Sequence, residues 1–132
     1  MKKMFILMSH DMTVAQYEDA EINYAIKNFI VIPSQFWSQI PAEIDSISSY
    51  LEDIKHNLMI ESNVGDILLV QGDFGATVEM VQFAFKQGLI PVYATTKRIA
   101  KEIVDGDKIT TIRTFEHVRF RKYYKDEIWQ KY

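Results

Sequence analysis

Residues 68–81 read LLVQGDFGATVEMV, and this stretch decides the fold class. Its apolar start is typical of a buried strand, whereas the pattern from Thr77 to Gln87 has the period of a helix. Gly72 and Gly75 mark a sharp turn between the two segments. A strand followed so closely by a helix favours an α/β protein.

The same alternation of strand and helix patterns continues in both directions along the chain. The predicted strands are 4–8, 29–32, 66–70 and 91–95, and the predicted helices are 14–25, 42–61 and 77–87. Two further strand-like segments, 99–104 and 108–121, flank Asp105-Gly106-Asp107, which predicts a β-hairpin. We therefore expect an α/β fold with a Rossmann-like, mainly parallel sheet flanked by helices. The C-terminal β-hairpin would extend one edge or mediate a dimer contact.

The composition indicates one domain over residues 1–132. The chain has 132 residues, of which 48% are hydrophobic and 13% aromatic, enough apolar surface for a core. It has no cysteine, which excludes disulfides and thiolate metal sites and suits a cytoplasmic location. Ser9, His10 and Asp11 interrupt the apolar start too early for a signal peptide or a membrane span. We expect no membrane partner.

Charge is distributed unevenly along the chain. The net charge of −3 disfavours binding of long nucleic acids by bulk electrostatics. Residues 1–96 hold 5 basic and 12 acidic side chains, a net −7, whereas residues 97–132 hold 10 and 6, a net +4. All arginines lie in the second segment: Arg98, Arg113, Arg119 and Arg121. This clustering indicates either a local anionic ligand or an exposed, solvated strand.

Three polar loops follow the predicted strands at their carboxyl ends, where ligands bind in open parallel sheets. The candidate binding residues in these loops are Ser9, Gln71, Gly72, Asp73, Phe74, Gly75, Ala76, Thr77, Thr95 and Thr96, together with His10, Lys97 and Arg98. The turn at 72–75 matches neither phosphate-binding glycine motif. By itself it is better explained as a strand-to-helix turn in which Asp73 or Thr77 caps the helix.

The three histidines differ in their setting. His10 lies at a strand end, which suits proton transfer or a hydrogen bond to a ligand. His56 lies within a predicted helix, and His117 lies on the last strand. Because none of them has a second ligand at metal-binding spacing, we expect no metal.

The last strand alternates in character. Alternation predicts that His117, Arg119 and Arg121 share one face and that Val118 and Phe120 share the other. The cationic face would contact phosphate, or would keep an exposed edge soluble. The aromatic side chains after it, which favour an interface or a core, are Tyr123, Tyr124, Trp129 and Tyr132.

Four stretches in this order resemble a known family over essentially the whole chain. They are Met8-Ser9-His10, Gln71 to Thr77, Pro91 to Arg98 and His117 to Arg121. Together they resemble small CRISPR-associated Csx-type ancillary proteins of type III systems. The resemblance implies a CARF-like (CRISPR-associated Rossmann-like) domain that acts as a homodimer on cyclic oligoadenylate. It also implies a ring nuclease that linearises cyclic tetra-adenylate and switches off type III antiviral signalling.

On this hypothesis the ribose 2′-hydroxyl attacks its neighbouring phosphorus without a metal or other cofactor. Lys97 and Arg98 bind the phosphate charge, while Ser9, His10 and Thr96 orient ribose and phosphate. The loop at 72–77 contacts adenine and backbone, and Arg119 and Arg121 close the site or stabilise the dimer. His10 is the first candidate for proton transfer and His117 the second.

Two other functions fit the same residues. A non-catalytic sensor or sponge would bind the cyclic nucleotide in the same pocket. A structural interaction protein would instead use the basic and aromatic C-terminal segment as its contact surface.

Overall fold

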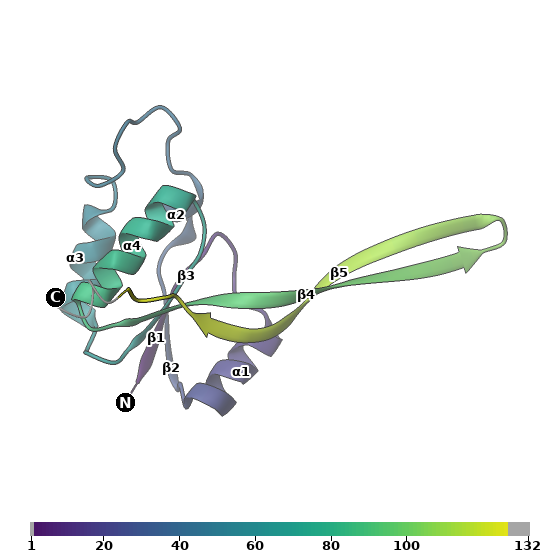
Figure 1. Ribbon diagram of the computed structural model, residues 1–132, viewed down its shortest axis with the longest axis horizontal. Helices are drawn as coiled ribbons and strands as arrows, with labels where there is room; N and C mark the ends of the chain where they lie inside the picture. Colours follow the sequence, from purple (N-terminus) through teal and green to yellow (C-terminus); the bar gives the residue numbers. More distant parts are fainter. Residues whose placement is uncertain (1, 127–132) are drawn as a thin grey trace.

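The computed structural model describes residues 2–126, so Trp129 and Tyr132 lie outside the described residues. Five strands and four helices occur within this range (Figure 1). In chain order they are β1 (Lys3–Leu7), α1 (Val14–Tyr24), β2 (Asn28–Val31), α2 (Ser34–Ser38), α3 (Glu52–Glu61), β3 (Ile67–Val70), α4 (Phe74–Lys86), β4 (Ile90–Asp105) and β5 (Lys108–Lys122). None of these helices is long and apolar enough to cross a membrane.

The strands form one mixed sheet in the order β2-β1-β3-β4-β5. The pairings from β2 to β4 are parallel; in the middle of the sheet, Phe5 lies between Ile30 of β2 and Leu68 of β3. β5 runs antiparallel to β4 along almost the whole length of both strands. The α/β prediction is confirmed. The mainly parallel sheet is confirmed only in part, because the longest pairing is antiparallel.

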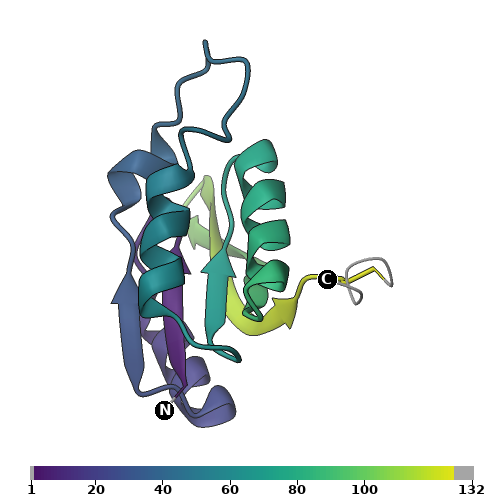
Figure 2. The ribbon, with the colours of Figure 1, turned by 90° about the vertical axis from the view of Figure 1, so that its left-hand side faces the viewer.

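Helices cover both faces of the sheet. Phe5, Leu7 and Leu68 pack with α3 and α4 on one face, and Figure 2 shows these two helices side by side in front of the strands. Met4 and Ile6 pack with α1 on the other face. Successive residues of β1 therefore enter opposite cores, which explains why its sequence is apolar without interruption.

The β-hairpin is confirmed, but the separate strands expected at 91–95 and 99–104 are one strand. β4 runs through 16 residues, and its turn into β5 contains Gly106 with a φ of +61°. No turn-forming residue interrupts residues 95–99, so the strand continues beyond the ends of the parallel strands. Residues 97–116 project from the body as a two-stranded ribbon, called the ribbon below (Figure 1).

The helix expected over 42–61 is wrong in its first half. Residues 42–51 form turns and bends, and α3 begins at Glu52. Ser46 Oγ accepts a 3.4 Å hydrogen bond from the Ser48 amide, and Ser48 Oγ donates to Glu79 at 2.6 Å. Such side-chain bonds compete with helical backbone bonds. Leu51 is nevertheless fully buried, so the apolar pattern predicted its burial correctly but the helix incorrectly.

Candidate functional site

A hollow of about 610 Å³ lies between the N-terminal end of α1 and the β4–β5 pair. Its lining residues are His10, Thr13, Ala15, Gln16, Thr96, Phe115, Glu116 and His117. His10 follows β1, whereas Thr96 and His117 face each other on β4 and β5. The fold thus brings together three predicted site residues from distant parts of the sequence.

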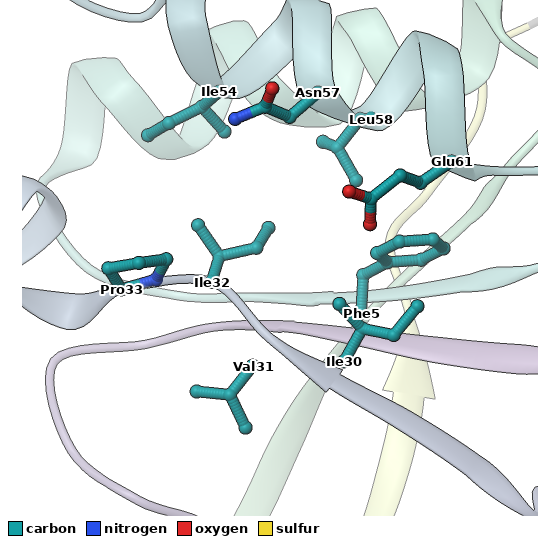
Figure 3. A pocket seen from close by; sticks show the side chains of 9 residues that line it. All are labelled: Phe5, Ile30, Val31, Ile32, Pro33, Ile54, Asn57, Leu58 and Glu61. Carbon is teal, nitrogen blue, oxygen red and sulfur yellow. The ribbon is translucent and has the colours of Figure 1, made fainter.

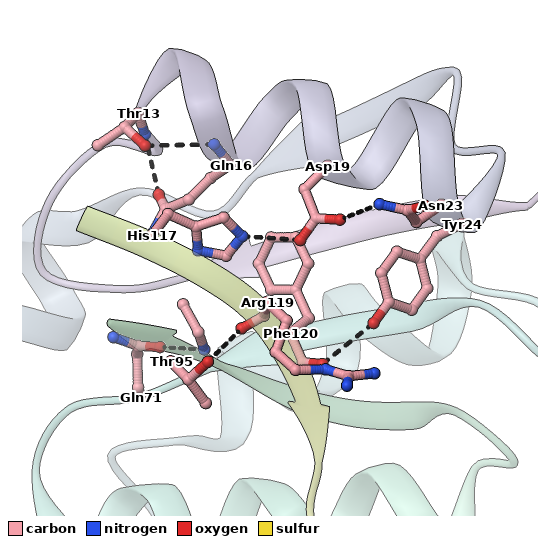
Figure 4. Close-up of polar contacts among 11 residues, drawn as sticks. Thr13, Gln16, Asp19, Asn23, Tyr24, Gln71, Thr95, His117, Arg119 and Phe120 are labelled. Carbon is pink, nitrogen blue, oxygen red and sulfur yellow. Dashed lines mark hydrogen bonds and ion pairs between the residues drawn. The ribbon is translucent and has the colours of Figure 1, made fainter. Parts of the chain in front are cut away.

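His117 forms a buried pair with Asp19 of α1. Its Nε2 donates to Asp19 Oδ2 at 2.7 Å, and the two side chains are only 5% and 12% exposed (Figure 4). The other carboxylate oxygen accepts from Asn23 at 2.6 Å. His117 Nδ1 is buried without a hydrogen-bond partner among the described residues. The carboxylate therefore selects the Nε2–H tautomer and leaves Nδ1 as a free acceptor.

A β-bulge sets the direction of the His117 ring. The pairing changes from Thr95 with Arg119 to Thr96 with His117, which leaves Val118 as an extra residue. The imidazole consequently lies 4.8 Å from the ring of Phe120, in the core under α1. The prediction that Val118 and Phe120 lie opposite His117 is wrong for Phe120.

Arg119 and Arg121 do not share the face of His117, which corrects the predicted alternation. Arg121 pairs with Tyr93 on β4, and its guanidinium donates to the Tyr93 hydroxyl at 3.1 Å. Tyr93 in turn contacts Tyr123, which packs on the core of α3 and α4. The Arg119 carbonyl accepts from Thr95 Oγ1 at 2.9 Å. Arg121 therefore faces the side of the sheet opposite the hollow.

The two neighbouring basic residues of β4 are separated by the pleat. Arg98 lies opposite Phe115, with its guanidinium 5.9 Å from the centre of that ring. Phe115 lines the hollow, so the Arg98 guanidinium lies beside a residue of its wall without itself lining it. Lys97 pairs with Glu116, which also lines the hollow, although strand alternation directs the Lys97 side chain to the other face of the ribbon from Arg98.

The loop after β1 leaves its polar side chains accessible. Ser9 and His10 are both exposed. His10 Nδ1 donates to the carbonyl of Asp11 at 3.0 Å, which leaves Nε2 as the nitrogen that a ligand can reach.

The loop that follows β3 makes hydrogen bonds to other parts of the chain. Gln71 Oε1 accepts from the Ala94 amide at 2.9 Å, which ties this loop to β4. Asp73 Oδ2 accepts from the Ala76 amide at 3.0 Å and caps α4. The capped strand-to-helix turn that the sequence favoured here is confirmed.

Gly72 leaves space for the side chain of Trp37. A Cβ at this position would lie 2.3 Å from Trp37 Nε1. That nitrogen donates to the Gln71 carbonyl at 2.9 Å, and the indole is buried. The backbone thus approaches the indole ring at the position where the sequence suggested an approach to a ligand.

The rest of this loop does not line the hollow. Phe74 and Gly75 are exposed, and Ala76 is buried under the sheet. The Thr77 hydroxyl is buried without a hydrogen-bond partner among the described residues.

A second, smaller hollow of about 120 Å³ lies between β2 and α3 (Figure 3). Its walls are mainly apolar, and Asn57 and Glu61 provide its polar side chains. None of the described residues that line it is basic, so they offer no cation to an anionic ligand. In residues 2–126, no three His, Asp or Glu side chains are gathered as metal ligands.

Residues 2–121 match the protein family described as the Uncharacterized protein MJ1673 family. The chain belongs to this family. Uncharacterized protein MJ1673 of Methanocaldococcus jannaschii is 50% identical over 126 residues, which cover 93% of this chain and 98% of that protein. No solved structure is significantly similar to the chain. The family match includes both the hollow and the ribbon.

Sequence reasoning missed the contribution of α1 to the site. Thr13 and Gln16 form a capping box, with bonds of 3.2 and 2.9 Å, and both line the hollow. Asp19 and Asn23 continue from Gln16 at steps of three and four residues. Polar residues at this spacing share one helix face, and Gln16 at its start is buried. A polar stripe on the inward face of α1 was the signal available in the sequence.

Proposed function

We propose that the chain is a ring nuclease that binds cyclic oligoadenylate, with cyclic tetra-adenylate as its preferred ring, and linearises it without a metal. The observation that carries this proposal is the hollow lined by His10, Thr96 and His117, whose ring Asp19 holds in place. Two imidazoles, a hydroxyl and a nearby guanidinium are groups that metal-independent phosphodiester cleavage uses.

The strand order supports a Rossmann-like, CARF-like domain. β1 has β2 on one side and β3 on the other, and α1 and α3 pack on opposite faces of the sheet. Ligands of doubly wound sheets bind beside the carboxyl end of such a central strand. His10 follows β1 at that end.

The reaction is an in-line attack by a ribose 2′-oxygen on the neighbouring phosphorus. A bond forms between phosphorus and O2′, and the bond between phosphorus and O5′ breaks. The linear product ends in a 2′,3′-cyclic phosphate and a 5′-hydroxyl. His10 Nε2, which a ligand can reach, takes the proton of the 2′-hydroxyl, and solvent protonates the departing 5′-oxygen. Arg98 neutralises charge that develops on the phosphoryl oxygens.

We assign proton transfer to His10 and a positioning role beside Thr96 to the Asp19–His117 pair, because His117 Nδ1 is buried. Asp19 holds the His117 ring in one orientation through the 2.7 Å contact with Nε2. His10 is exposed and has only a backbone carbonyl to orient it.

The proposal includes a homodimer in the cytoplasm, where cleavage of the ring switches off type III CRISPR signalling. Two copies related by a two-fold axis present two hollows to a cyclic ligand that has symmetry of its own.

The test is incubation of the purified chain with cyclic tetra-adenylate in EDTA, followed by liquid chromatography and mass spectrometry. Linear products that end in a cyclic phosphate are expected. His10→Gln keeps a polar side chain but has no basic nitrogen, so the rate should fall about 10²- to 10⁴-fold. His56→Gln, an exposed position on α3, is the matched control and should be unchanged. Full activity of His10→Gln would refute its assigned role.

Ligand binding separates the competing functions. Arg98→Ala should weaken binding of the ring strongly, whereas Lys97→Ala, its neighbour on the other face, should weaken it much less. Tight binding with intact ligand would identify a sensor or sponge. Absence of both binding and cleavage would refute the nucleotide proposal for this ring.

A further inference from the structure

The ribbon is the least covered part of the described structure. From Thr96 to Asp105, β4 extends about 30 Å at ~3.3 Å per residue. β5 is its partner along this length, and Figure 1 shows both strands running away from the body. The exposed fractions of Ile103, Val104, Ile109, Ile112 and Phe115 are 43, 68, 66, 43 and 66%.

Apolar side chains occupy both faces of the ribbon. Val104 lies opposite Ile109 on one face, and Phe115 follows on the same face. Ile103 and Ile112 lie on the other face. An isolated two-stranded ribbon is at best marginally stable in water. A partner that contacts both faces would remove this apolar surface from solvent.

Charge identifies a chemically suitable partner. Residues 97–122, which contain the ribbon and its base, hold 8 basic and 4 acidic side chains, whereas residues 1–96 hold 5 and 12. The acidic side chains exposed on the body include Glu18 and Glu21 on α1 and Glu52 and Asp53 on α3. The ribbon itself, residues 97–116, holds 5 basic and 4 acidic side chains, and Arg119, Arg121 and Lys122 at its base supply the remaining positive charge. The body of a second copy therefore offers the opposite charge mainly to the base of the ribbon.

We propose that the ribbon is a dimerisation arm that lies across the body of a second copy of this chain. In a two-fold pair each copy gives and receives one arm, so both ribbons are covered at once. A body of about 100 residues has a radius of gyration of ~13 Å, so an arm of about 30 Å crosses most of it. Two exchanged arms give an interface that can reach the ~800 Å² per partner of stable complexes.

The arm also links dimerisation to the hollow. Phe115 and Glu116 belong to the ribbon and line the hollow, and Arg98 lies against Phe115. A second copy seated on the base of the ribbon covers the exposed side of Phe115. The hollow is then completed only in the dimer. This inference rests on the homodimer of the proposed function, but its test measures the mass of the assembly rather than cleavage of the ring.

The experiment is light scattering or sedimentation equilibrium on the full chain at micromolar concentration. A mass of twice 15.5 kDa is expected. The double variant Val104→Thr/Ile109→Thr keeps β-branched side chains, so the ribbon still forms, but it makes the facing pair polar. It should shift the mass to one chain. Val64→Thr, an 84% exposed valine between α3 and β3, is the matched control and should remain dimeric.

A shortened ribbon provides the second variant. Replacing residues 99–114 with Asn-Gly joins the facing residues Arg98 and Phe115 through a two-residue turn. This variant should be monomeric and should unfold as cooperatively as the natural chain. A monomeric natural chain, or variants that remain dimeric, would overturn the inference. If the natural chain is a dimer that becomes a monomer when the ribbon is shortened, but it does not cleave the ring, the dimerisation arm is supported and the nuclease is refuted.

Discussion

Replacing Gly72 with alanine tests whether this glycine serves Trp37 or a ligand. The new Cβ would lie 2.3 Å from Nε1 and 2.8 Å from Cε2 of the indole, where ordinary contacts begin at 3.4 Å. The ring must therefore move by about 1 Å, because the backbone is held by β3 and by the cap of α4.

The expected loss of stability follows from these contacts. Displacing the ring breaks the 2.9 Å bond from Trp37 to the Gln71 carbonyl, which contributes about 1 kcal/mol. Overpacking of a buried site costs a further ~1–3 kcal/mol. The free energy of unfolding should fall by about 2–4 kcal/mol in all, a large share of the ~5–15 kcal/mol of a typical domain. For a chain of this size the midpoint of thermal unfolding should fall by about 10 °C.

Gly75→Ala in the same loop is the matched control. Its Cβ would meet Ile47 at 3.5 Å and Asp73 at 3.7 Å, which are ordinary contacts. Because Gly75 is helical, alanine there should be neutral or stabilising by up to ~1 kcal/mol. Urea and thermal unfolding of both variants, monitored by circular dichroism, measure the difference.

A double-mutant cycle with Trp37→Phe checks the cause. Phenylalanine lacks the indole Nε1 that the new Cβ approaches most closely and has a single, smaller ring, so Gly72→Ala should cost less in that background. Equal stability of the Gly72→Ala and Gly75→Ala chains would refute the reasoning. Weaker binding of cyclic tetra-adenylate by a fully stable Gly72→Ala chain would instead indicate a ligand-binding loop.

Substitutions at three further sites probe the cap of α4, a half-buried phenol and the histidine pair. Asp73→Ala should lower the free energy of unfolding by about 1 kcal/mol because α4 loses its cap, while Asp73→Asn should be nearly neutral; urea titration compares them. Burial, and then the nearby Tyr93, raise the pKa of Tyr123 from 10 to about 12. The folded chain thus holds this proton more tightly than the unfolded chain, so stability should fall as pH rises from 10 towards 12. This part of the pH dependence should be absent from Tyr123→Phe in parallel unfolding titrations. Asp19→Asn should lower kcat with little change in KM, because Asp19 acts through His117 and does not touch the ligand; an unchanged kcat would make the pair purely structural.

Much of the fold was predictable because a short apolar run indicates, from neighbouring residues alone, which segment is buried. The runs at Met4 to Met8 and at 66–70 became central strands, and Asp105-Gly106-Asp107 became the expected hairpin turn. The prediction of a helix over 42–51 was wrong because turns, which serine hydroxyls stabilise, bury the same apolar residues there. Periodicity reports which residues are buried before it reports the backbone that buries them.

The candidate site was predictable only in outline. Strand-end reasoning brought His10 and Thr96 to the same hollow, because parallel strands end at one edge. It could not find Asp19, which is 98 residues from His117. It also placed His117 on the wrong face, because a single extra residue at Val118 reverses the alternation and leaves no local mark in the sequence.

The sequence by itself determined the alternation of strands and helices, the uneven charge and the hairpin turn, since each depends on neighbouring residues. Tertiary structure decided that Gly72 serves Trp37, that His117 faces Asp19 and that the ribbon extends beyond the sheet. These features join residues far apart in the chain. Their geometry depends on how the elements pack, and packing is set by the whole fold rather than by any one segment.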